Sequence, residues 1–147
     1  MADRYWVGGT ANWDATAGSK WALTSGGAGG QAVPTASDDV YFDAASGAVT
    51  VTVGAATANC LTMTCTGFTG TIAGAAGIQA VGNVTLVAGM GFTHTGGIGW
   101  ITASSSATFI SAGKTIATVI IGTATFSPTV IHSFPTRRSS DHRKSVV

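Results

Sequence analysis

Residues 47–53 read GAVTVTV, and residues 61–66 read LTMTCT. In both runs apolar and hydroxyl-bearing side chains alternate, which is the period-two pattern of a β-strand with one face toward a core. The pattern recurs at Val84, Leu86 and Ala88, and again across residues 116–121. Glycine and asparagine separate the runs, so we expect strands of about five residues at intervals of roughly 7–15 residues.

The composition also predicts an all-β fold. The chain has 147 residues, with 21 Gly and 23 Thr, and only 9% of its residues are charged, against about 25% in ordinary domains. All six acidic residues are Asp, and the scarcity of Glu, Lys and Arg is unfavourable for helix surfaces. No run reaches the ~18 apolar residues that a spanning helix needs, so we expect no membrane insertion.

Two all-β architectures fit the strand pattern. Between Ala44 and Ile131 the only charged residue is Lys114. Hairpin folds usually place Lys and Glu on exposed edges, whereas small Thr, Ser and Ala faces suit like-on-like stacking along a coil. We therefore predict a right-handed parallel β-helix, that is, a β-solenoid, with a sandwich or barrel as the second choice.

The first 45 residues have a different composition from the rest. They contain Trp6, Trp13 and Trp21, spaced by seven and eight residues, with Gly pairs and Pro34 that exclude a continuous helix. Large aromatic residues between turns can cover the open end of a β stack. We expect residues 1–45 to form an N-terminal cap or attachment segment and residues 46–131 to form the rungs of a truncated solenoid.

The last sixteen residues break from this pattern. The run His132–Asp141, HSFPTRRSSD, resembles the translation of a common sequencing-library adapter. We expect residues 132–147 to be a non-native tail and the natural protein to continue beyond Ile131. Without the tail, three basic and five acidic residues remain, so the net charge changes from +1 to −2. The basic cluster is therefore no nucleic-acid patch, and no nucleic-acid partner is expected.

The N-terminal motifs RYWVGGT (4–10), NWD (12–14) and DDVYFD (38–43), followed by GFTGTIAG (67–74), resemble a group of phage and metagenomic proteins interpreted as tail-fibre or other virion structural proteins. SSATFISAGKTIATVIIG (105–122) resembles their recurring rung, and the likeness covers nearly all of residues 4–126. It implies a β-helical, trimeric fibre and no catalytic residues. A looser form of the opening also precedes β-helices in secreted bacterial adhesins.

The sequence offers few candidate site residues. Asp38, Asp39 and Asp43 form the one acidic cluster, without the spacing of a calcium loop, so we expect them to form turns and hydrogen bonds at the junction of cap and coil. Lys114 and His94 are the only bases in the coil, which lacks the constellation that a polysaccharide lyase requires. We interpret Lys114 as a solvated turn residue and His94 as a surface or turn residue.

Other patterns favour structural roles. The odd separation of Cys60 and Cys65 places them on opposite faces of one strand, so we expect buried free thiols and no disulfide. The glycine run 26–30 lacks the Lys and Ser/Thr of a phosphate loop. Ice binding needs a regular Thr lattice, and the TxT pairs are irregularly spaced. These pairs are Thr50/Thr52, Thr62/Thr64, Thr69/Thr71, Thr93/Thr95 and Thr123/Thr125.

These observations predict a structural or adhesive virion protein, a tail fibre or similar surface fibre of a bacteriophage, with no catalytic, cofactor-binding or metal-binding residues. We expect self-association as a homotrimer and binding to host cell-surface glycan or to other virion proteins. The N-terminus lacks a secretory signal, which suits synthesis in the host cytoplasm and a location in the virion. The alternatives are a secreted bacterial β-helical adhesin and a polysaccharide-degrading β-helix enzyme whose active site lies outside this segment.

Overall fold

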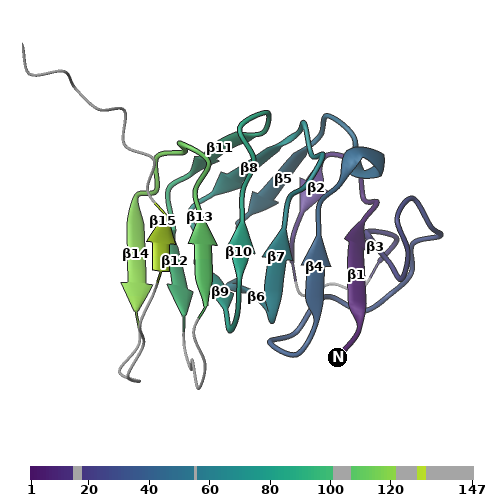
Figure 1. Ribbon diagram of the computed structural model, residues 1–147. Helices are drawn as coiled ribbons and strands as arrows, with labels where there is room; N and C mark the ends of the chain where they lie inside the picture. The colour runs from purple at the N-terminus through teal and green to yellow at the C-terminus, as the bar shows by residue number, and fades with distance from the viewer. Residues whose placement is uncertain (15–17, 55, 101–106, 122–128, 132–147) are drawn as a thin grey trace, which may run out of the picture.

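The computed structural model describes residues 1–14, 18–54, 56–100, 107–121 and 129–131, which form a β-solenoid of about four turns (Figure 1). Its strands lie in three sheets. Sheet A contains, in spatial order, β3 (Trp21–Ala22), β1 (Asp3–Trp6), β4 (Asp39–Tyr41), β7 (Thr62–Thr64), β10 (Val84–Thr85), β13 (Thr108–Ile110) and β15 (Thr129–Ile131). Sheet B contains β2 (Ala11–Asn12), β5 (Thr50–Val53), β8 (Thr71–Gly74) and β11 (Gly91–His94). Sheet C contains β6 (Ala58–Cys60), β9 (Ile78–Ala80), β12 (Gly97–Trp100) and β14 (Thr118–Ile121).

Each coil visits the three sheets in turn. The chain passes from β4 through β5 to β6, then from β7 through β8 to β9, and then from β10 through β11 to β12. In Figure 1 the strands of sheet A point upward, and the chain returns downward behind them. Each successive coil lies farther from the N-terminus, so the solenoid is right-handed. All described strand pairs are parallel except the antiparallel pair of β1 and β3. The predicted fold class is confirmed, and the sandwich is excluded.

In-register stacking builds the core. In sheet A, Val40 pairs with Met63, Met63 with Val84, and Val84 with Phe109, and all four side chains are buried. The residues that follow them in the strands, such as Thr64, are only partly buried and point outward. Because side chains alternate along a strand, stacking in register repeats the same inward position in every coil.

Sheets B and C follow the same rule with other residues. Val51 pairs with the buried Ile72 in sheet B, and Ala58, Ile78 and Ile98 form a buried line in sheet C. Three apolar lines therefore converge on one continuous core.

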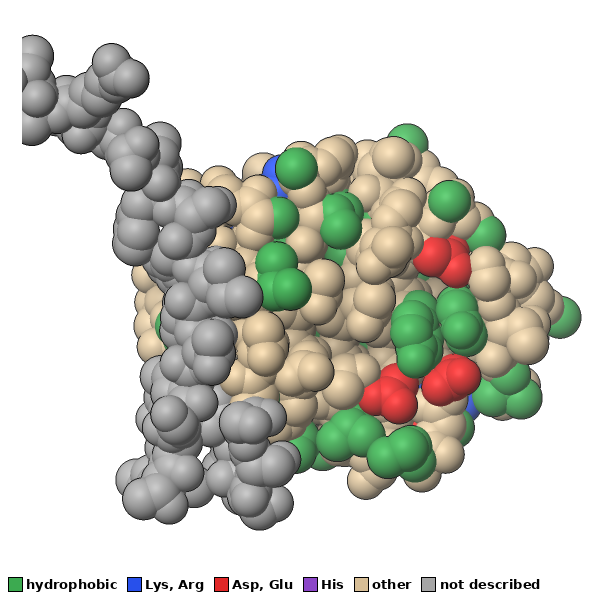
Figure 2. All heavy atoms as spheres, in the orientation of Figure 1, with side chains coloured by type: hydrophobic (Ala, Val, Ile, Leu, Met, Phe, Trp, Pro, Cys, Tyr) green, Lys and Arg blue, Asp and Glu red, His purple; other side chains and the backbone are tan. Residues whose placement is uncertain are grey.

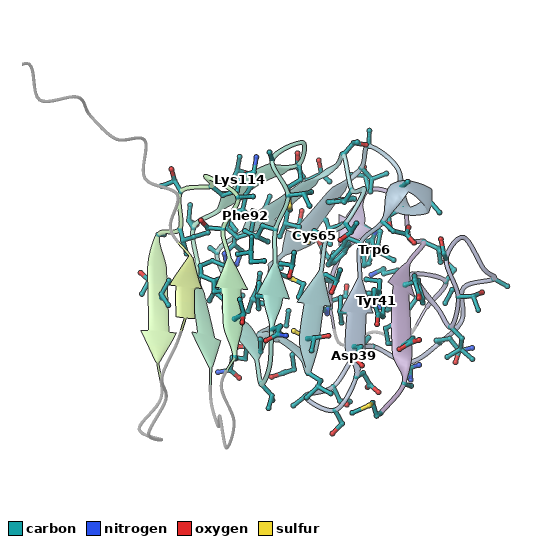
Figure 3. The ribbon with its side chains drawn as sticks, in the orientation of Figure 1. Trp6, Asp39, Tyr41, Cys65, Phe92 and Lys114 are labelled. Atoms are coloured by element: carbon teal, nitrogen blue, oxygen red, sulfur yellow. The ribbon has the colours of Figure 1, made fainter. Side chains whose placement is uncertain are left out.

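Aromatic side chains close the N-terminal end of this core. Trp6 and Trp21 meet edge to face, with ring centroids 5.0 Å apart, and Trp13 lies 5.3 Å from Trp21. Phe42 lies 5.5 Å from Trp13 and joins the tryptophans to Phe68 in the next coil. All five rings are at most 1% exposed, and Figure 3 shows Trp6 between the sheets. The predicted Trp-rich cap is present, and its strands β1 and β2 extend sheets A and B.

Close approach of neighbouring coils dictates some of the glycines. Gly74 ends β8 with φ of 113°, and a Cβ placed there would lie 2.0 Å from the carbonyl oxygen of Val53 in the coil below. Only glycine adopts such a φ without strain and leaves room for that oxygen. Gly89, in contrast, has open space around its Cα.

We predict that Gly74→Ala lowers the free energy of unfolding by about 2 kcal/mol or more. Alanine is strained at this φ, and its Cβ would push the two coils apart. Gly89→Ala is the matched control and changes it by less than about 1 kcal/mol. Urea unfolding followed by tryptophan fluorescence measures both. Equal midpoints for the two variants would contradict the stacking described here.

Candidate functional site

The three aspartates of the cap serve as hydrogen-bond acceptors. The Asp38 carboxylate accepts bonds from the Ala2 amide at 3.0 Å and from the Thr35 hydroxyl and amide at 2.7 and 3.0 Å. Burial opposes ionisation of Asp38, but the Thr35 bonds, the Arg4 charge and the Ala2 bond together hold its pKa below the ordinary value. Asp38 therefore ties the N-terminus to the segment before β4.

Asp39 and Asp43 have similar structural roles. Asp39 accepts a hydrogen bond from the Thr62 hydroxyl of the next coil. Asp43 is the N-cap of the 3-10 helix η1 (Ala44–Ser46), where its carboxylate accepts the Ser46 amide at 3.1 Å. The expectation of turns and junction hydrogen bonds is confirmed. The described residues include no group of three or more His, Cys, Asp or Glu arranged to hold a metal ion.

A pair of tyrosines marks the outer face of sheet A. Tyr5 on β1 and Tyr41 on β4 pair in register, and their rings stack with centroids 4.6 Å apart and planes 13° apart. Burial and the neighbouring carboxylates, Asp3 for both rings, raise the pKa of both phenols. Figure 2 shows acidic side chains around hydrophobic ones on this face, which otherwise carries few charges. Sequence reasoning missed this cluster, since it depends on pairing across 36 residues.

Lys114 is anchored to the preceding coil. Its ammonium donates to the carbonyl oxygen of Ala88 at 2.8 Å and to that of Met90. The prediction of a merely solvated turn lysine is wrong for a geometric reason. The amides of Phe68, Met90 and Lys114 each donate to the carbonyl three residues earlier. The turns therefore stack, and the Lys114 side chain meets the carbonyls of the turn before it.

His94 is buried, and its interpretation as a surface or turn residue is wrong. It is 3% exposed at the end of β11, and its Nε2 lies 2.7 Å from the Ala76 carbonyl oxygen. Its Nδ1 has no partner among the described residues, and its ring lies 5.6 Å from that of Phe92. His94 stacks in line with Gly74 and the buried Val53, so alternation along β11 places its side chain inward, where it is not available as a surface base.

The two cysteines are buried and free, as expected, but not for the reason expected. They lie on different strands: Cys60 ends β6 in sheet C, and Cys65 follows β7 in sheet A. The corner at Leu61 resets the alternation, so both side chains face the core. The pKa of each thiol is raised to about 12, and burial is the main cause.

The remaining sequence patterns form turns and strand faces. Gly26 has φ of 63°, and the Gly27 amide bonds to the Thr24 carbonyl, so the glycine run forms a turn. Outward positions of sheet B read Thr50, Thr71, Gly91 along one line and Thr52, Ala73, Thr93 along the other. These lines are not uniform Thr ladders. The pair Thr123/Thr125 lies outside the described residues, as does the predicted tail of residues 132–147.

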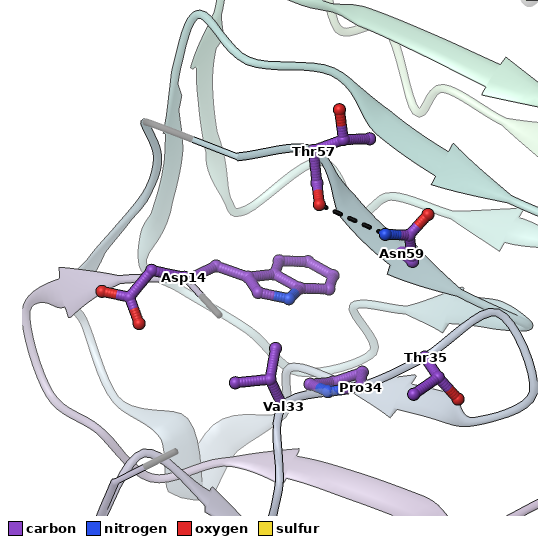
Figure 4. A pocket seen from close by; sticks show the side chains of 7 residues that line it. Asp14, Val33, Pro34, Thr35, Thr57 and Asn59 are labelled. Atoms are coloured by element: carbon purple, nitrogen blue, oxygen red, sulfur yellow. Dashed lines mark hydrogen bonds between the residues drawn. The ribbon is translucent and has the colours of Figure 1, made fainter. Parts of the chain in front are cut away.

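A pocket of about 240 Å³ lies beside the cap, and sequence reasoning did not find it. Its lining residues come from three places in the chain: Trp13 and Asp14 after β2, Val33, Pro34 and Thr35 before β4, and Thr57 and Asn59 at β6. Figure 4 shows Thr57 and Asn59 on one side of the space and Val33, Pro34 and Thr35 on the other. No motif predicts it, because distant segments create it.

Comparison with protein-family models, with curated proteins and with solved structures gives no match for this chain. Function must therefore be argued from the fold and the surface. Within the part of the chain that the structure describes, no helix has the length and hydropathy that crossing a bilayer requires.

We predict that Lys114→Met lowers the free energy of unfolding by about 1–3 kcal/mol, because two backbone carbonyls lose a charged donor. The matched control is Lys20→Met, which breaks the 3.0 Å ion pair with Asp14. That pair is partly exposed and contributes about 0–1 kcal/mol. Chemical denaturation compares the two variants. A Lys114 variant no less stable than the Lys20 variant would show that the anchor is unimportant.

We predict that neither thiol reacts with a disulfide reagent at pH 8 in the folded protein, while both react in denaturant. A folded pKa raised to about 12 from 9.0 means that the folded state binds more protons than the unfolded state in this interval. Stability should therefore be unaffected below about pH 9 and fall as the pH rises toward 12. Thiol titration and denaturation at several pH values measure this. Rapid labelling without denaturant would contradict the buried placement.

Proposed function

We propose that this chain is a structural, adhesive protein of a bacteriophage particle, part of a tail fibre or similar surface fibre located in the virion. The observation that carries the proposal is the stack of parallel coils around one continuous core. Inner strands such as β7 and β8 have hydrogen-bonded neighbours on both sides, which makes a stiff rod. The resemblance of the Trp- and Gly-rich opening to virion proteins supports the same assignment.

The proposed role is mechanical rather than catalytic. The two bases of the coil are both engaged: carbonyls bind the Lys114 ammonium, and His94 is buried. Neither is positioned to take a proton from a bound substrate. A fibre needs a shape that resists bending and unfolding, and the stacked sheets supply it.

We further propose that the fibre is a homotrimer. Lys114 is the only charge between residues 44 and 131, so the coil surface has little charge to keep copies of the chain apart. Exposed apolar side chains at outward positions add to this surface: Ile110 is 38% exposed and Ile120 57%. Packing of three chains side by side would cover such faces.

We predict that sedimentation equilibrium of the 147-residue chain gives the mass of three copies. Three variants, each with a lysine added to one sheet, then identify the face that packs against the other copies. They are Thr85→Lys on sheet A, Thr93→Lys on sheet B and Gln79→Lys on sheet C. The variant on the buried face should dissociate the trimer, because an unpaired charge is costly to bury, and the others should not. A monomeric, well-folded parent chain, or a trimer that all three variants leave intact, would contradict lateral packing.

A further inference from the structure

We propose that the pocket beside the cap binds one uncharged sugar ring of a glycan. This inference rests on the adhesive part of the proposed function and specifies its site.

Within the described residues, the three sheets end unevenly at the N-terminal side, and the pocket lies at that end. Sheet A continues past β4 with β1 and β3, and sheet B continues past β5 with β2. In sheet C, the described residues supply no strand beyond β6. The pocket lies at this edge of β6, between Asn59 and residues 33–35.

This edge of β6 presents backbone groups as well as side chains. The Ala58 amide bonds to the Gly77 carbonyl at 2.9 Å, toward β9. Alternate residues of a parallel strand turn their peptide groups to opposite sides. The peptide groups of Asn59 accordingly face the side away from β9, where a ligand with both donors and acceptors can use them.

The aromatic wall contains an unused donor. Trp13 is 1% exposed, and its Nε1–H has no acceptor among the described residues, whereas the equivalent group of Trp6 donates to the Gly9 carbonyl at 3.0 Å. A buried donor without a partner is unfavourable. A ligand oxygen that enters the pocket would accept this bond, and the partly exposed Val33 offers apolar surface to its C–H groups.

The lining selects a neutral polar ligand. Among the described residues, Asp14 is the only ionisable one that lines the pocket, and it already forms an ion pair with Lys20. A charged ligand would have no counterion, and an apolar one would desolvate the Thr57 hydroxyl and the Asn59 side-chain oxygen without replacing their hydrogen bonds. The Asn59 side-chain amide already donates to the Thr57 carbonyl at 3.3 Å (Figure 4). A sugar ring combines hydroxyl groups with apolar C–H faces. The volume of about 240 Å³ is below that of pockets for drug-sized ligands, which fits one ring and excludes an added strand of peptide.

The test uses the ¹⁵N-labelled full chain and its four tryptophan indole N–H resonances. The probes are the methyl glycosides of glucose, galactose, mannose and N-acetylglucosamine, with N-acetylneuraminic acid as the charged comparison. Trp13→Phe identifies the Trp13 resonance by its loss. At least one neutral glycoside should shift that resonance with millimolar affinity, and the charged sugar should not.

Variants on one face of sheet C then locate the binding. Asn59→Ala should weaken the affinity at least tenfold. Gln79→Ala occupies the paired outward position one coil further along and should leave it unchanged. An unmoved Trp13 resonance with every neutral probe overturns the proposal, and so does equal binding by the two alanine variants. A trimer that binds no sugar refutes only this site, while a monomer that binds sugar refutes only the trimeric fibre.

Discussion

The inward line of sheet A is the constraint on which the rest of the structure depends. Val40, Met63, Val84 and Phe109 occupy one position in four successive coils and are all buried. A slip of one residue in any of these strands would exchange a core side chain for an outward one, as Thr64 for Met63 in β7. The turns, not the strands, therefore absorb differences in coil length. Met63 follows its partner by 23 residues and Phe109 by 25, without loss of register.

The same constraint creates a problem at the first coil, since no earlier rung covers its core. The chain solves it with aromatic rings. Trp6, Trp13 and Trp21 pack against each other and against Phe42, so the end of the core is covered by side chains of one segment. These rings bury the apolar atoms at the end of the core, but two of their own polar atoms are buried without a hydrogen bond. The indole nitrogens of Trp13 and Trp21 lack acceptors within the described part of the chain, and the sheets end unevenly around them.

Much of this fold could be predicted from the sequence because strand alternation is a local property. The TVTV of β5 and the flanking turns specify an inward and an outward face without reference to any neighbour. Corners do not follow that rule. Between Cys60 and Cys65 the chain leaves sheet C and enters sheet A, and the count of residues no longer tells which way a side chain points. Residues 118–121 read TVII, and only pairing of Val119 with the buried Ile98 shows which of them faces inward.

The missed features share one physical origin, which is contact between coils. Lys114 has no sequence neighbour that would predict its partners, because Ala88 and Met90 lie one coil away. The stacked Tyr5 and Tyr41 likewise meet across strands. A solenoid brings residues together at intervals set by coil length, and that length varies here, so no fixed spacing in the sequence reveals the pairs. The pocket follows as the extreme case, since three segments far apart in the sequence line it. In such a fold, binding surfaces should therefore arise where stacking is interrupted rather than where it repeats.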